Sequence, residues 1–242
     1  MNIYILTSDK SIDLVEGLQY CVNKYWNPNP SVIILGYKKP LFELDDNFKF
    51  VSLGEDRGPD SVGEDLINFF NTIDDEHFIF SVDDFFPIRR INTFLLGCLE
   101  NQIINENISR IALTDQVRNK SHSVIIEDLY HKHKIIEMGQ SENYRISAVW
   151  SMWSKEYFLK YLTPTTNLWQ WEMSSPCKKD NHRIIGTKDK YVLQSCHLVK
   201  RGKLKRDWYK DSESADVMVD SDIEIVSKFI GDDRITKMIK RQ

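Results

Sequence analysis

The sequence of 242 residues predicts an α/β fold in which a mixed sheet is flanked by helices. In the first half of the chain, apolar runs of strand length alternate with segments of helical periodicity. Their order is strand, helix, strand, strand, helix, strand, which is typical of a parallel sheet covered on both faces. One strand-like run, residues 78–82, ends abruptly in two adjacent carboxylates, Asp83 and Asp84. The second half is less regular.

Each element of the first half follows from a local pattern. Apolar residues at helical spacing predict a helix over 11–25, which Asn27-Pro-Asn-Pro30 ends. Continuous apolar runs bounded by turn residues predict the strands. The predicted elements are strands at 2–6, 32–35, 48–53, 78–82 and 110–114, and helices at 11–25, 61–73 and 90–105.

In the second half, residues 124–130 and 134–138 are typical of a hairpin. An amphipathic helix is expected at the C-terminal end, with basic residues in its last turn. The other elements predicted there are strands at 145–150 and 191–199, helices at 155–162 and 223–239, and a short piece rich in tryptophan at 168–173. No repeat or linker divides the sequence, so we expect one domain over 1–242.

Composition excludes several classes of protein. The net charge of −4 argues against a dedicated nucleic-acid binder, although basic residues cluster at 200–206. No apolar run reaches the ~18–20 residues that a membrane span needs. The four cysteines form no CxxC pair and are expected to be reduced thiols in a cytoplasmic protein without a targeting segment.

The acid pair Asp83–Asp84 has two interpretations. An unpaired carboxylate at the end of a buried strand is costly, and a hard divalent cation such as Mg²⁺ or Mn²⁺ would compensate it. In a mostly parallel sheet, ligands bind just beyond the carboxyl ends of the strands, where these acids fall. Alternatively, the pair is a solvated turn in which Asp84 caps a helix.

Four motifs, in this order, make the chain resemble GT-A glycosyltransferases, especially a group of small bacterial and viral enzymes. The motifs are Phe78-Ile-Phe-Ser-Val-Asp83-Asp84-Phe-Phe, Trp153-Ser-Lys-Glu-Tyr-Phe-Leu159, Trp169-Gln-Trp171-Glu172 and Arg201-Gly202-Lys203. The resemblance covers residues 1–206. It implies a Rossmann-type nucleotide-binding half at 1–114, an acceptor half at 115–206 and a C-terminal segment and helix at 207–242.

The resemblance also implies an activity. The chain would use Mn²⁺ or Mg²⁺ and a nucleotide-sugar donor, expected to be a UDP-sugar, to glycosylate a glycan or another hydroxyl acceptor, with donor hydrolysis as a side reaction. It would act in the cytoplasm of a bacterium or of a virus-infected cell. Two alternatives stay open: a sugar nucleotidyltransferase, and a shortened module that binds nucleotide or glycan without turnover.

The metal motif departs from the family pattern, because Ser81 and Val82 precede the acids where a strict Asp-X-Asp would need another carboxylate. Aligned on the last acid, Asp84 holds the metal and Asp83 contacts the ribose or supports the site; aligned one residue earlier, Asp83 holds it. Neighbouring side chains of an extended chain point to opposite faces, so equal ligation by both is not expected. His197 would complete the metal set; otherwise it is a core histidine.

Other positions match the donor side of the family. Thr7, Ser8 and Asp9 follow the first strand and would meet the base and ribose, or would cap the next helix. Tyr37 would stack on the base, or is a surface tyrosine of a loop. Arg57 would grip the diphosphate, as would Arg201 and Lys203 from the late basic loop. Each of these three basic residues is otherwise a solvated loop residue.

Trp169, Trp171 and Glu172 are expected to form the acceptor pocket. Sugars present C–H faces to aromatic rings and hydroxyl groups to carboxylates, and the cluster combines both. Glu172 is the predicted general base, which would accept the proton of the acceptor hydroxyl. The alternative places the tryptophans in the core and Glu172 on the surface.

Overall fold

A computed structural model describes residues 1–117, 120, 122–129, 133–173, 175–188, 192–197, 199–200, 203–204, 218 and 220–230. Its strands are β1 (Ile3–Leu6), β2 (Val32–Gly36), β3 (Phe48–Ser52), β4 (His77–Val82), β5 (Phe85–Pro87), β6 (Arg110–Ala112), β7 (Val124–Leu129), β8 (His133–Glu137), β9 (Ser151–Ser154), β10 (Ile184–Thr187), β11 (Ser195–His197), β12 (Val199–Lys200) and β13 (Lys203–Leu204). Its α-helices are α1 (Leu14–Tyr25), α2 (Val62–Phe70), α3 (Thr93–Asn105), α4 (Lys155–Lys160), α5 (Leu168–Glu172) and α6 (Asp220–Phe229).

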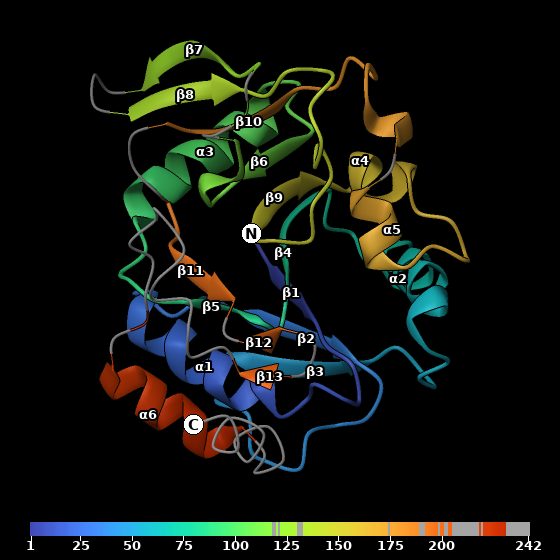
Figure 1. The fold of residues 1–242 in the computed structure, drawn as a ribbon, viewed down its shortest axis with the longest axis vertical. Coiled ribbons are helices and arrows are strands. Elements are labelled where there is room, and N and C mark those ends of the chain that lie inside the picture. The colour runs from blue at the N-terminus through green and yellow to red at the C-terminus, as the bar shows by residue number, and fades with distance from the viewer. Residues whose placement is uncertain are drawn as a thin grey trace.

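Within the described residues, nine strands form one mixed sheet in the order β3-β2-β1-β4-β9-β6-β10-β8-β7 (Figure 1). The first four are mutually parallel, β9 is antiparallel to both of its neighbours, and β6 is parallel to β10. The carboxyl ends of β1, β2, β3, β4 and β6 therefore meet at one edge of the sheet. This arrangement confirms the predicted mixed α/β fold.

The sheet is covered on both faces, and alternate residues of each strand point to opposite sides. In β1, Ile3 and Ile5 pack with α1 and α3 on one face, whereas Tyr4 and Leu6 pack with α2, α4 and α5 on the other. The second face carries an aromatic cluster centred on Phe158, whose ring contacts Phe70, Phe78, Phe80, Trp153 and Trp171. Because the central strands are buried on both faces, their sequences are continuous apolar runs.

Helix α6 lies beside α1 on the outside of the first face (Figure 1). The buried carboxylate of Asp222 accepts hydrogen bonds from Tyr20, Lys24 and Tyr25 of α1. Gly17 allows the close approach, because a Cβ atom there would come within 2.9 Å of Val226. No helix of the described residues is long and apolar enough to cross a membrane.

Most predicted elements are confirmed within a few residues, but the second half differs in three places. Residues 145–150 are not a strand; the strand begins at Ser151, and β10 was not predicted. The physical reason is that side chains bind the backbone of this segment as far as Val149: Arg145 O accepts from Arg110, Ala148 N donates to Glu172, and Val149 N donates to Ser147 Oγ. The strand expected at 191–199 is shorter, with β11 at Ser195–His197, and residues 231–239 of the last predicted helix lie outside the described part.

Candidate functional site

The candidate site lies at the sheet edge where the parallel strands end. Leu6 of β1 pairs with Val82 of β4, so the next residues, Thr7 and Asp83, come level with each other. Tyr37 follows β2 at the same edge. Parallel strand order alone thus brings together predicted site residues that are up to 76 positions apart in sequence.

Asp83 is the inner acid of the pair. It is buried, and its Oδ2 accepts a hydrogen bond from the Thr7 hydroxyl at 2.5 Å. Its backbone N–H donates to Leu6 O at 3.1 Å. The carboxylate of Asp83 is therefore turned toward β1 and fixes the loop that follows it.

Asp84 points to a different partner, as the alternation of an extended chain requires. Its Oδ2 lies 2.7 Å from His197 Nε2, and the two side chains are 29% and 23% exposed. The pairing of β11 with β5 sets Phe85 opposite His197, and the two rings stack with their centroids 4.7 Å apart. The other oxygen, Asp84 Oδ1, is buried and has no hydrogen-bond partner among the described residues.

This pair fits a divalent cation. A buried carboxylate oxygen without a donor is costly, and an imidazole nitrogen beside it is a common metal ligand. In the described part of the chain, however, no group of three or more histidine, cysteine, aspartate or glutamate residues is arranged to hold a metal. Oδ2 of Asp83 is bonded to Thr7. Mg²⁺-like ions typically use only one or two carboxylates and take their other ligands from water and phosphate.

The loop after β1 is held by its own polar groups. The hydroxyls of Ser8 and Ser11 are 2.8 Å apart. Asp9 reaches across to the loop after β2, where Oδ1 accepts from the Lys38 N–H at 3.0 Å and Oδ2 pairs with Lys38 Nζ at 3.2 Å. The two loops in which we expect a base and ribose to bind are thus tied together.

Tyr37 and Arg57 meet at Asp65, a buried acid of α2 that is not among the predicted site residues. The Tyr37 hydroxyl donates to Asp65 Oδ2 at 3.0 Å, and Arg57 Nη2 donates to Oδ1 at 2.5 Å. The Tyr37 side chain is buried, which raises its pKa above the usual range, so its ring presents little surface to a base. Arg57 also pairs with Glu64 and remains 45% exposed.

Helix α5 carries the predicted acceptor residues, and a capping box of Asn167 and Gln170 fixes its start. Trp169 is 72% exposed, whereas Trp171 is fully buried and stacks on Trp153 with ring centroids 5.3 Å apart. The two rings are two positions apart on a helix and so face different directions. Trp171 offers no surface to an acceptor in this arrangement.

Glu172 is anchored through one of its two oxygens. Oε1 accepts from Ser147 Oγ at 2.8 Å and from Ala148 N at 2.7 Å. Three residues after Ser147, the Trp150 indole donates to Phe85 O at 2.8 Å, and Phe85 is the residue after Asp84. The segment that holds Glu172 therefore runs beside the chain that leaves β4, at the same edge as the acid pair.

A close contact links the Arg57 loop to helix α5. Gly63 N donates to Thr166 O at 2.9 Å, and Asn167 donates to Asp60 at 2.8 Å. A Cβ atom at Gly63 would lie 2.1 Å from Thr163 O, so only glycine fits there. The loop of Arg57 and helix α5, where we predict donor and acceptor residues, are thereby connected.

The late basic loop, residues 200–206, lies mostly outside the described residues. Arg201 lies outside the described residues. Lys203 belongs to β13, whose backbone pairs with Lys200 of β12, and its side chain is not described. Both positions stay predictions.

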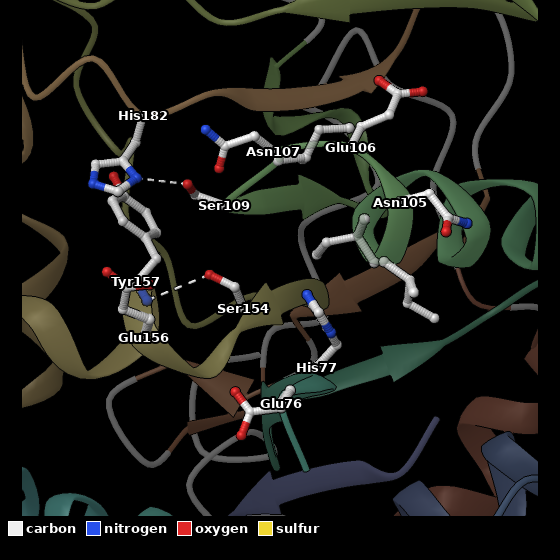
Figure 2. A pocket seen from close by; sticks show the side chains of 13 residues that line it. Glu76, His77, Asn105, Glu106, Asn107, Ser109, Ser154, Glu156, Tyr157 and His182 are labelled. Carbon is white, nitrogen blue, oxygen red and sulfur yellow. Dashed lines mark hydrogen bonds between the residues drawn. The ribbon is translucent and has the colours of Figure 1, made fainter.

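A pocket of about 400 Å³ lies at the opposite edge of the sheet (Figure 2). It is lined by the end of α3 and by the beginnings of β4 and α4, among them Glu76, His77, Glu106 and Glu156. His77 and Asp83 are separated by the length of β4, roughly 20 Å at ~3.3 Å per residue. This pocket is therefore separate from the acid pair.

No family model matches the chain, and no curated protein matches it in sequence. Among solved structures, a mannosyltransferase from Pyrobaculum calidifontis, PcManGT, in complex with GDP-Man and Mn²⁺, is 12% identical over 83% of this chain and 57% of its own, with a TM-score of 0.50. Residues 1–349 of TarS from S. aureus are 13% identical over 78% of this chain and 58% of that one, with a TM-score of 0.48. This chain thus spans less than two thirds of either structure. The likeness to PcManGT concerns the fold and agrees with the predicted GT-A-like architecture.

Proposed function

We propose that this chain is a metal-dependent glycosyltransferase that takes a sugar from a nucleotide-sugar donor, expected to be a UDP-sugar, and transfers it to a hydroxyl acceptor. The observation that carries the proposal is the pair Asp84–His197, with its buried and unpartnered Asp84 Oδ1, at the edge of the mixed sheet where the parallel strands β1, β2, β3 and β4 end. This edge is where open α/β sheets bind their ligands.

On the donor side, Asp84 would hold Mn²⁺ or Mg²⁺, with His197 beside it and Asp83 in support. When bound, such an ion offsets the negative charge that develops on a departing diphosphate. Thr7, Ser8 and Asp9 would meet the nucleoside, since their loop begins beside Asp83. The half-exposed guanidinium of Arg57, fixed by Glu64 and Asp65, would approach the phosphates together with Arg201 and Lys203.

On the acceptor side, Glu172 Oε1 is occupied by two donors, which leaves Oε2 to accept the proton of an acceptor hydroxyl. The acceptor oxygen would then form a bond to the anomeric carbon as the bond from that carbon to the diphosphate oxygen breaks. A base in this role predicts inversion at the anomeric carbon. The exposed ring of Trp169 would support a sugar face, and the buried Trp171 would hold α5 in place.

Calorimetric titration of UDP, GDP and CMP, each with and without Mn²⁺, tests the donor side. We expect UDP to bind, and to bind at least tenfold more tightly when Mn²⁺ is present. A panel of nucleotide sugars incubated with Mn²⁺ then tests turnover, because slow hydrolysis releases the nucleoside diphosphate even when the acceptor is unknown. Absence of metal-dependent binding by all three nucleotides would overturn the proposal. Binding without any turnover would favour a non-catalytic module.

A further inference from the structure

We propose that Arg110, Gln116 and Ser147 are positioning residues that hold the carboxylate of Glu172 through a directed chain of hydrogen bonds. This inference rests on the proposed function, in which Glu172 is the base. Arg110 lies in β6 and is fully buried, so its guanidinium must find all of its partners inside the protein.

All five N–H groups of Arg110 are used. Nε and Nη2 donate to Ser151 Oγ, Nη1 donates to the carbonyl oxygens of Tyr144 and Arg145, and Nη2 also donates to Gln116 Oε1. None of these acceptors is ionised, and no described carboxylate forms a direct ion pair with Arg110. Burial lowers the pKa of Arg110 to about 10, which still leaves it cationic at neutral pH.

Two neutral side chains, Gln116 and Ser147, connect the Arg110 cation to the Glu172 carboxylate by hydrogen bonds. Gln116 accepts from Arg110 with its oxygen and donates with its Nε2 to Ser147 Oγ at 2.7 Å. Ser147, which is 1% exposed, donates a hydrogen bond from its hydroxyl group to Glu172 Oε1 at 2.8 Å. Every link points the same way, from the cation to the carboxylate, so each group polarises the next.

This arrangement explains why Oε1 of Glu172 is fixed while Oε2 is left for substrate. The Arg110 guanidinium also binds the backbone at 144–145, and the Trp150 indole binds the chain after Asp84. These two sets of contacts hold the two ends of the segment 144–150, whose Ser147 and Ala148 bind Glu172, beside the chain that follows Asp84. A displacement of about 1 Å at such a base costs up to roughly 100-fold in rate.

The test uses Gln116→Leu and Ser147→Ala in the whole 242-residue chain, because removing Arg110 itself would leave several buried acceptors unsatisfied and would endanger folding. Ser109→Ala is the matched control. Ser109 is also a buried serine with a hydrogen-bonded hydroxyl, 2.6 Å from His182, but it lies at the opposite edge of the sheet.

The first measurement needs no substrate. The Ala148 amide donates to Glu172 Oε1, so its ¹⁵N–¹H resonance reports the position of that carboxylate. We expect Gln116→Leu to shift this resonance and to speed its hydrogen exchange, as Glu172→Gln does, while Ser109→Ala leaves it unchanged. If Gln116→Leu left both the chemical shift and the hydrogen exchange of the Ala148 amide unchanged, the inference would be overturned.

The second measurement uses the nucleotide sugar that the turnover screen identifies. Gln116→Leu and Ser147→Ala should each lower kcat about tenfold with donor KM and UDP affinity unchanged, and neither should lower kcat further in a Glu172→Gln background. An undiminished effect in that background would show that the residues do not act through Glu172. If no nucleotide sugar is turned over, the proposed function fails, and the Ala148 resonance still decides whether the hydrogen-bond chain through Gln116 and Ser147 holds Glu172.

Discussion

His197 Nε2 lies 2.7 Å from Asp84 Oδ2, although the two residues are 113 positions apart in the chain. Their contact depends on the small two-stranded sheet in which β11 pairs with β5 and sets His197 opposite Phe85. Asp84 is thus joined to the first half of the chain by β4 and to the second half by His197. A cation bound here would connect both halves with the phosphates of a donor.

Substitutions at Asp83, Asp84 and His197 should distinguish the residue that holds the metal from those that support it. We expect Asp84→Asn to abolish the Mn²⁺ dependence of UDP binding, because it removes the negative charge of the carboxylate whose Oδ1 has no partner. His197→Ala and Asp83→Asn should weaken Mn²⁺-dependent binding by about 10- to 100-fold, the usual effect of supporting groups. Calorimetry with UDP and Mn²⁺ measures all three, and circular dichroism checks that each variant is folded.

The reverse order, with Asp83→Asn more damaging than Asp84→Asn, would show that the register lies one residue earlier. If a variant with both substitutions bound UDP with unaltered Mn²⁺ dependence, the metal site would lie elsewhere.

Thr7 should matter for stability as well as for the site. Thr7→Val keeps the shape of the side chain but removes the donor that Asp83 holds at 2.5 Å inside the protein. Removing a hydrogen-bond donor from a buried carboxylate costs about 1–3 kcal/mol in the free energy of unfolding. Urea denaturation at neutral pH measures this loss. Thr7→Ser retains the hydroxyl and should recover most of it; equal losses in both variants would mean that the methyl group, not the hydrogen bond, matters.

The two tryptophans of α5 should behave in opposite ways. Trp171→Ala removes a fully buried ring that packs against Trp153 and Phe158, and we expect a loss of about 3–5 kcal/mol of stability. Trp169→Ala changes a ring that is 72% exposed and should alter stability by no more than about 0.5 kcal/mol. Urea denaturation separates them. Comparable losses at both positions would contradict the orientation in which α5 buries Trp171 and exposes Trp169.

The first half of the fold could be predicted because its signals are local. Strands buried on both faces appear as apolar runs, and the turn residues between them mark the connections. The position of the acid pair followed from the same pattern, since Asp83 and Asp84 interrupt an apolar strand. The contact between Asp84 and His197 was expected only through the resemblance to GT-A enzymes.

The rest depends on long-range contacts that leave weak marks in sequence. Residues 145–150 have the composition of a strand, but Arg110 and Glu172 bind their backbone and the sheet begins only at Ser151. Asp65 resembled an ordinary surface acid of a helix, yet it is buried and receives Tyr37 and Arg57. An arginine that opens an apolar strand, as Arg110 does, was the one available sign of a buried polar network.

The attachment of α6 to α1 should depend on pH through Asp222. Burial acts to raise the pKa of Asp222, but the hydrogen bonds from Lys24, Tyr25 and Tyr20 together lower it below its ordinary value. A carboxyl whose pKa is lower in the folded state stabilises that state fully above its unfolded pKa of about 3.9. This contribution is lost as the pH falls through the lower, folded value.

We therefore expect Asp222→Asn to lower the free energy of unfolding by about 1–3 kcal/mol at pH 5–7, the cost of weakening a buried hydrogen-bonded charge. The difference between wild type and variant should shrink as the pH falls below about 4. Urea denaturation between pH 3 and pH 7 measures it. Asp74→Asn changes the net charge equally at an exposed position and serves as the control. A difference for Asp222→Asn that stays constant down to pH 3, or one that Asp74→Asn reproduces, would mean that the Asp222 charge does not fasten α6 to α1.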